Sequence, residues 1–298
     1  MPATTTPGGA ALGLRQPQDL ATVATDRAPA DAIVFDGVSL AFDDHVVLKD
    51  LSFSIPKGAM RILFGVSGAG KSQILKLALG LLRPDAGAIW VNGQRVDHMS
   101  ERDLLRMRAD IGMVFQENAL FDSLTVAENV GFRLLEDHEL SEQQVDERIA
   151  EVLGFVGLGE YGDRMPSELS GGQRRRVGIA RAMASKPGLL LFDDPITGLD
   201  PLIATSIDDE IVKLRDLEDV TTLVVTHQIR DAFYIAEHKA AKDGAAVNVI
   251  KAGAAQVPNV EFLVLKDGTI AFQGPADELL ASTDPYLTEY LYRTLPPW

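Results

Sequence analysis

A glycine-rich segment with a lysine and a hydroxyl residue at fixed positions offers the clearest chemistry in this sequence. The segment GVSGAGKS runs from Gly65 to Ser72 and fits the pattern G-x-x-x-x-G-K-[ST]. Glycines let successive backbone N–H groups converge on phosphate oxygens, while Lys71 supplies a cation and Ser72 a hydroxyl ligand for Mg²⁺. We therefore predict a P-loop that binds ATP with Mg²⁺. The residues predicted to contact the nucleotide in this loop are Gly65, Ser67, Gly68, Ala69, Gly70, Lys71 and Ser72.

A pair of aspartates follows a short apolar run later in the chain. In GLLLFDD, four apolar residues precede Asp193, which places a carboxylate at the tip of a strand buried on both faces. Such a carboxylate would hold Mg²⁺ beside the nucleotide, directly or through water. A carboxylate that merely ends a strand is common, so the prediction depends on the P-loop occurring in the same chain.

The segment LSGGQ, from Leu169 to Gln173, narrows the choice among nucleotide-binding proteins. It is the signature of ATP-binding cassette (ABC) proteins, which this chain resembles over about residues 32 to 275. Seven motifs occur in the order of that family. They are Phe42, the P-loop, Gln116 in VFQ, LSGGQ, LLLFDDP, Asp200 in GLDP and His227 in VVTH.

The resemblance implies an α/β fold, the ABC ATPase nucleotide-binding domain, with a RecA-like P-loop core, an antiparallel β subdomain and a helical subdomain. It also implies a head-to-tail dimer, in which the signature of one copy closes over the ATP held by the other. Each ATP site would then be composite, with Asp200 at the dimer seam. The signature residues expected to contact ATP are Ser170, Gly171, Gly172 and Gln173.

The resemblance assigns further roles around the reacting phosphate. Gln116 would lie near Mg²⁺ and the attacking water, His227 would contact the γ-phosphate, and Phe42 would stack on adenine. A purely structural role is the alternative for His227, and a place in the core is the alternative for Phe42. The run Arg174–Arg176 is expected to be a solvated helix face.

One position departs from the family pattern. After the first Asp of LLLFDDP, which is Asp193 here, the family usually has Glu, which polarises the attacking water. This chain has Asp194 at that position. Aspartate is shorter by roughly 1.5 Å of reach, and a displacement of about 1 Å can cost on the order of 100-fold in rate. We expect an active but slow ATPase, with the predicted catalytic residues Asp194, His227 and Gln116 and the predicted metal ligands Ser72, Gln116 and Asp193.

Short apolar runs and helical periods predict the elements that carry these residues. Runs of strand type lead into the P-loop, which is followed by a helix that ends before Pro84, and LLLF and TTLVV are expected in a parallel sheet. We expect a flexible leader over 1–31, the ABC domain over 32–275, a helical subdomain at about 117–180 and an insertion loop at about 240–259. The tail, 276–298, is expected to pack on the dimer mate or a partner.

Composition excludes several classes. The chain has 298 residues, no cysteine and a formal charge of −15, so disulfides, thiolate metal sites and a broad basic surface for nucleic acid are all absent from its expected chemistry. No stretch approaches the roughly 18 consecutive apolar residues of a membrane-spanning helix, and we expect no secretory signal. If the protein acts at a membrane, we expect it to act from outside the bilayer.

The sequence around Gln116, FQENALFDSLTVAENVGFRL, most resembles the corresponding segment of the ATPases of lipid transport systems that maintain outer-membrane asymmetry (Mla) and carry mammalian-cell-entry (MCE) domain proteins. The implied partners are transmembrane permease subunits and an MCE-domain lipid-binding protein, and the implied location is the cytoplasmic face of the inner membrane. Another importer or exporter, for amino acids or lipoproteins, is the alternative. A soluble ABC protein of DNA repair or the ribosome would require a second cassette or a basic surface.

Overall fold

The computed structural model describes residues 30–66, 68–137, 140–218, 220–244, 246–253 and 257–294. The predicted leader therefore lies outside the described residues up to position 29, as do Ser67 of the P-loop and the last four residues of the tail. Within the described part of the chain, no helix is both long enough and apolar enough to cross a bilayer.

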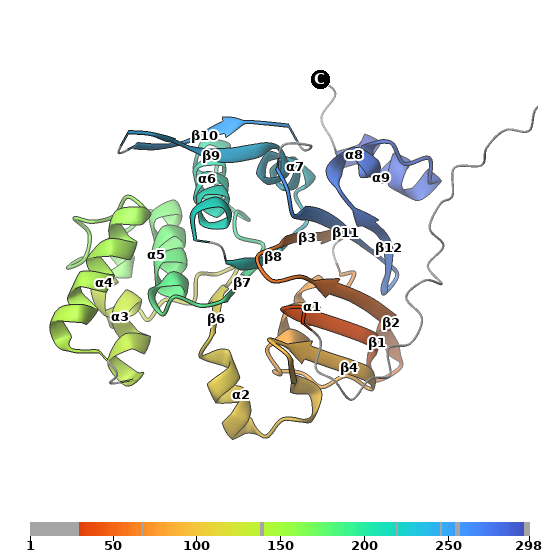
Figure 1. The fold of residues 1–298 in the computed structure, drawn as a ribbon, viewed down its shortest axis with the longest axis horizontal. Helices are drawn as coiled ribbons and strands as arrows, with labels where there is room; N and C mark the ends of the chain where they lie inside the picture. The colour runs from red at the N-terminus through yellow and green to blue at the C-terminus, as the bar shows by residue number, and fades with distance from the viewer. Residues whose placement is uncertain are drawn as a thin grey trace, which may run out of the picture.

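A six-stranded sheet forms the centre of the molecule (Figure 1). Its order is β12-β11-β3-β8-β7-β6, and every neighbouring pair is parallel except β11 with β12. Both β3 and β8 are buried along their whole length, as their continuous apolar runs predict. The strands are β3 (Met60–Gly65), β6 (Ile111–Val114), β7 (Leu189–Asp193), β8 (Thr221–Thr226), β11 (Val260–Lys266) and β12 (Thr269–Gly274).

Two hydrophobic cores lie on opposite faces of this sheet. Alternate residues of β3 point to opposite sides, so that Ile62 and Phe64 join one core and Leu63 joins the other. The second core also holds α1 (Lys71–Ala78) and an antiparallel sheet of order β2-β1-β4-β5. That sheet consists of β1 (Ile33–Phe42), β2 (His45–Ile55), β4 (Ala86–Val91) and β5 (Gln94–Arg95), and α2 (Glu101–Arg108) follows it.

A group of helices occupies one end of the molecule (Figure 1). Its members are α3 (Val126–Asp137), α4 (Glu142–Phe155) and α5 (Gly171–Ala184), which pack on one another through buried aliphatic side chains of the first core. Both α4 and α5 begin with a capping box, in which a serine and a glutamine satisfy each other's backbone N–H groups. The fold is the predicted α/β architecture with an antiparallel sheet and a helical part.

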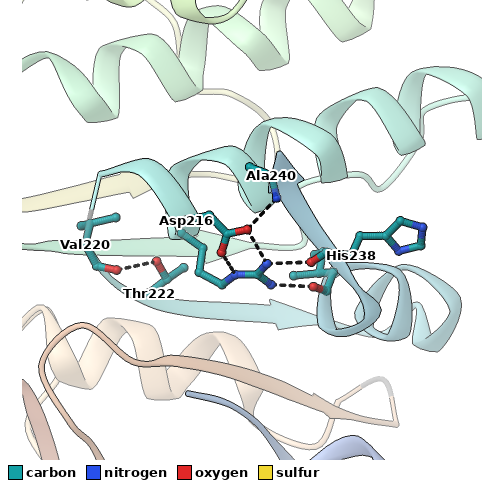
Figure 2. Close-up of polar contacts among 7 residues, drawn as sticks. Asp216, Val220, Thr222, His238 and Ala240 are labelled. Carbon is teal, nitrogen blue, oxygen red and sulfur yellow. Dashed lines mark hydrogen bonds and ion pairs between the residues drawn. The ribbon is translucent and has the colours of Figure 1, made fainter. Parts of the chain in front are cut away.

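The segment that we expected to be an insertion loop forms a β-hairpin instead. Its strands are β9 (His238–Asp243) and β10 (Ala246–Lys251). Asp216, on α6 (Pro201–Leu217), accepts a hydrogen bond from the Ala240 backbone N–H at 2.7 Å (Figure 2). The neighbouring Arg215 donates to the carbonyls of Ile235 and His238, both at 2.7 Å. The sequence did not reveal this hairpin, because its residues are mostly small and its polar contacts come from Arg215 and Asp216 on α6, 23 and 24 residues earlier.

The tail packs on its own domain as far as it is described. It contains α8 (Ala276–Leu280) and α9 (Pro285–Thr294), and Leu287 and Leu291 are buried in the first core beside α7 (Ile229–Glu237). The Tyr290 ring stacks on Phe64, with ring centroids 5.8 Å apart. A contact of the tail with a dimer mate or a partner stays a prediction.

Candidate functional site

The predicted site residues gather because neighbouring parallel strands end at the same edge of the sheet. In the register of β3, β8 and β7, Phe64 pairs with Thr226 and Val225 pairs with Asp193. The P-loop follows β3, His227 follows β8, and Asp194 follows β7. Crevices at the carboxyl ends of parallel strands are the usual ligand sites of open α/β sheets. Three motifs predicted separately therefore meet at one place.

The P-loop has the backbone shape that its glycines predict. Gly68 and Gly70 have φ of 81° and 98°, in the left-handed region that favours glycine. A Cβ at Gly70 would also lie 2.7 Å from Cγ1 of Val47, so this position excludes a side chain on two grounds. The helix α1 begins at the next residue and presents its N-terminus to the loop. This is an anion-binding arrangement.

Lys71 is held by the loop's own carbonyl groups. Its Nζ donates to the carbonyls of Gly65 at 2.9 Å and Val66 at 3.0 Å, and the residue is only 7% exposed. Burial lowers the pKa of Lys71, and the nearby charges of Asp194 and Asp193 oppose that shift. A buried cation with carbonyl partners is positioned to exchange them for phosphate oxygens.

Ser72 and Asp193 meet below the loop. The Ser72 hydroxyl donates to Oδ1 of Asp193 at 2.9 Å. Burial raises the pKa of Asp193, while this hydrogen bond acts in the opposite direction. Both side chains offer hard oxygen ligands, which is the donor type that Mg²⁺ takes. Gln116, the third predicted ligand, lies exposed beyond the end of β6.

Asp194 and His227 form a direct pair. The Asp194 Oδ1 accepts from the His227 backbone N–H at 3.0 Å and lies 2.9 Å from the His227 Nδ1. Asp194 has φ of 45°, a left-handed conformation that aspartate adopts more readily than most residues. With Nδ1 facing the carboxylate, Nε2 is the imidazole nitrogen left for a ligand. The sequence predicted both residues but not their contact.

The predicted signature residues act in this chain as helix-start residues. Ser170 is the N-cap of α5, and its hydroxyl accepts from the Gln173 backbone N–H. Gly172 lets α5 lie close to α6, because a Cβ at this position would lie only 2.3 Å from Cγ2 of Ile203. Asp200 caps α6 by accepting from the N–H groups of Leu202 and Ile203. No hydrogen bond or ion pair joins Ser170–Gln173 to the P-loop within the described ranges.

Phe42 lies at the end of β1, in the tight turn that pairs it with His45 of β2. Its side chain is 44% exposed, so the alternative of a core residue is wrong. The same hairpin brings Val47 against Gly70, which places this turn on the P-loop side of the antiparallel sheet. The ring is thus available for stacking.

The interpretation of Arg174–Arg176 as a solvated helix face is wrong. Arg175 is 2% exposed and donates to the carbonyls of Phe115 and Gln116, both at 2.6 Å. Arg174 donates to Leu169 and Arg176 to Val156, again through backbone carbonyls. Three charges in a row gave no sign of these partners, because three of the four partner carbonyls lie 20 residues or more away in the sequence.

Comparisons with known proteins agree with this geometry. The model of the ABC transporter family matches residues 48–197. The chain is 37% identical over 267 residues to Protein TRIGALACTOSYLDIACYLGLYCEROL 3 of Arabidopsis thaliana, covering 84% of this chain and 70% of that protein. It is 32% identical over 260 residues to the probable ribonucleotide transport ATP-binding protein mkl of Mycobacterium bovis, covering 87% and 66%.

Among solved structures, the chain resembles the dimeric post-hydrolysis state of the ATP-binding cassette MJ0796 bound to ADP and Pi. The TM-score is 0.67 at 27% sequence identity, over 82% of this chain and 98% of the other. The fold is therefore shared with an ATP-binding cassette that binds ADP and Pi.

Proposed function

The chain belongs to the ABC transporter family and is an ATP-hydrolysing subunit of that family, and we propose that it powers phospholipid transport between the inner and outer membranes of a Gram-negative-type envelope. The observation that carries the ATPase assignment is the meeting of the P-loop, Asp193, Asp194 and His227 at one sheet edge. The plant relative, whose name contains that of a diacylglycerol lipid, supports the lipid cargo.

In the proposed reaction the P-loop amides and Lys71 bind the phosphates of ATP, while the exposed Phe42 ring stacks on adenine. Ser72, Asp193 and Gln116 would hold Mg²⁺, which supplies charge neutralisation at the β- and γ-phosphate oxygens when bound. Asp194 orients and polarises the attacking water, and its contact with Nδ1 fixes the His227 ring so that Nε2 faces the γ-phosphate. Lys71 leaves its two carbonyl partners when phosphate arrives.

Hydrolysis is proposed to be slow. The Asp194 Oδ1 already accepts two hydrogen bonds from His227, so one carboxylate oxygen remains for the water. The short side chain reaches less far toward that water than a glutamate would. Capture of ATP does not depend on this residue, because the phosphate contacts lie in the P-loop.

The second half of each ATP site is proposed to come from another copy. Ser170, Gly171, Gly172 and Gln173 have no link to the P-loop of the same chain among the described residues. They begin a helix, and a helix N-terminus binds anions. The dimeric state of the similar MJ0796 cassette supports a head-to-tail dimer.

An exposed aromatic surface beside Gln116 is the proposed docking site for the permease. Phe115, Phe121 and Phe132 are 40%, 44% and 39% exposed, and the rings of Phe121 and Phe132 lie 4.7 Å apart. Exposed aromatic clusters of this kind favour a protein partner. Through the permease the chain would sit on the cytoplasmic face of the inner membrane, in a complex that also contains an MCE-domain protein.

The tail is proposed to contact the dimer mate or an accessory subunit in addition to its own domain. Tyr292 on α9 is 86% exposed although its neighbour Leu291 is buried. Replacing Tyr292 by alanine should weaken the complex without lowering the free energy of unfolding of the single chain. Unchanged assembly would restrict the tail to local packing.

A different small-molecule cargo is the second candidate, since the similar mycobacterial protein is named for ribonucleotide transport. Co-purification from native membranes separates the two candidates. An MCE-domain protein together with a permease is the expected result. A periplasmic solute-binding protein in place of the MCE-domain protein would contradict phospholipid transport and leave the ATPase assignment standing.

A further inference from the structure

Two arginines of α5 hold the loop that carries Gln116. Arg175 donates to the carbonyls of Phe115 and Gln116 at 2.6 Å each. Arg181 donates to the carbonyls of Ala119 at 2.7 Å and Asn118 at 2.9 Å. Four of the five carbonyls from 115 to 119 are thus bound to one helix. We call these five residues the Gln116 loop.

The backbone of the Gln116 loop needs such support. Asn118 and Ala119 are consecutive residues with φ of 65° and 47°, and alanine rarely adopts this left-handed conformation. Gly178, midway between the two arginines on the helix, lies beside Asn118 with room for a side chain: a Cβ there would lie 3.8 Å from the Asn118 carbonyl oxygen, an ordinary contact. It is Arg181 that holds the loop on α5, at the two residues whose conformation is least favourable.

The burial of Arg175 is unusual for a charged residue. It is 2% exposed, and its Nε, which is fully buried, has no hydrogen-bond partner among the described residues. Burial lowers the pKa of Arg175, and the charge of Asp194 opposes this shift, so the guanidinium lies within electrostatic reach of the reacting centre. A guanidinium stays protonated in proteins, so the site keeps a buried cation next to two carbonyls that flank Gln116.

The helix that binds the loop is also the helix that begins at the signature. Ser170 caps α5, and Arg175 and Arg181 follow about one and three turns later. Arg174 and Arg176, which flank Arg175, donate to the carbonyls of Leu169 and Val156, outside the Gln116 loop. Only Arg175 and Arg181, among these four arginines, therefore connect α5 to the Gln116 loop.

We propose that Arg175 and Arg181 are positioning residues that fix the Gln116 loop to the signature helix, so that Gln116 and the signature move as one unit. The proposal rests on the proposed role of Gln116 as a ligand of Mg²⁺. Neither arginine is among the residues predicted to contact the nucleotide. Their effect is exerted through the backbone of residues 115–119, and it would link closure of the dimer to the placement of Gln116.

The test compares ATP turnover and its Mg²⁺ dependence in purified variants. Arg175→Met should lower kcat by about tenfold or more, as expected for a misplaced site group, and raise the Mg²⁺ concentration needed for half-maximal turnover. Affinity for ATP without Mg²⁺ should not change, since the P-loop is untouched. Arg181→Met should shift the Mg²⁺ dependence in the same direction but less, and Arg175→Lys should restore part of the loss because an ammonium also donates to carbonyls.

Arg176→Met is the matched control, since it removes the same charge from the same helix but a hydrogen bond outside the Gln116 loop, to the Val156 carbonyl. If Arg175→Met or Arg181→Met matches this control in kcat and Mg²⁺ dependence, the proposal is wrong. If Arg175→Met does not fold, Arg181→Met against the same control decides. Gln116→Ala tests the premise separately: it must itself raise the Mg²⁺ requirement, and a normal requirement would contradict the role of Gln116 whatever the arginines do.

Discussion

The strand-end region and the signature region differ in what completes them. At the sheet edge, hydrogen bonds within one chain join the site residues to one another or to the P-loop. These residues are Lys71, Ser72, Asp193, Asp194 and His227. The signature and Asp200 instead satisfy the starts of their own helices. One region is therefore preorganised for phosphate, and the other is built so that a second copy can approach it.

This difference separates two steps of the proposed function. Binding of ATP depends on the preorganised region, where Lys71 is buried and the other groups are held by hydrogen bonds before the ligand arrives. Hydrolysis needs both regions, since electrostatic stabilisation works best when donors surround the phosphate and exclude water. Changes to the P-loop of the first region should therefore affect binding and turnover, whereas changes in the second region should affect turnover with little effect on binding by the single chain.

The largest effect is expected at Lys71. Replacing Lys71 by alanine removes the cation that faces the phosphates and should lower turnover by on the order of 100-fold or more, with a clear loss of ATP affinity. Equilibrium binding of a fluorescent ATP analogue and steady-state phosphate release measure the two effects. Lys57→Ala, an exposed change outside the site, is the control, and normal ATP affinity in Lys71→Ala would contradict the proposed contact.

A smaller effect, on turnover but not on ATP affinity, is expected at Ser170. Ser170→Ala should lower turnover about tenfold, the scale of a hydrogen bond to a charged group, while ATP affinity of the single chain stays unchanged. It should also cost about 1 kcal/mol of stability through the lost N-cap. Ser141→Ala removes an equivalent capping box from α4, so it should cost similar stability and leave turnover intact. Equal turnover in the two variants would reduce Ser170 to a helix cap.

Asp194→Glu should raise turnover. The longer side chain restores reach toward the water, and the expected gain is several-fold, up to about 100-fold if position alone limits the rate. Asp194→Asn, which keeps the length but removes the charge, should lower turnover. Both are measured by phosphate release at saturating ATP. A glutamate variant that is no faster than the native chain would contradict the slow-ATPase hypothesis.

The smallest effect is expected on thermal stability, where α6 packs on α7. Burial, and next the charge of Asp231 on α7, raises the pKa of Asp208 on α6 well above its ordinary value. The folded state thus binds more protons here, so stability is lost as the pH rises above the ordinary carboxyl pKa. Asp208→Asn should raise the Tm at neutral pH, with a gain that shrinks in acid. Asp146→Asn, an exposed change on α4, should show no such pH dependence.

The residues that carry local signals were predicted from the sequence. The glycines of the P-loop, the run before Asp193 and the strand before His227 act within a few neighbours, and the structure brings them together as expected. Contacts between distant segments were not predictable in this way. The burial of Arg175 depends on carbonyls 59 and 60 residues away. The hairpin at 238–251 is held by Arg215 and Asp216 through contacts that span 23 and 24 residues of sequence.

Mixing two impaired variants tests the composite site most directly. In a dimer of Lys71→Ala with Ser170→Ala, both defects fall in one site, and the other combines an intact P-loop with an intact signature. Equimolar mixing should therefore restore a substantial part of the turnover that each variant lacks alone. A mixture no more active than the better variant would contradict the claim that the signature of one copy completes the ATP site of the other.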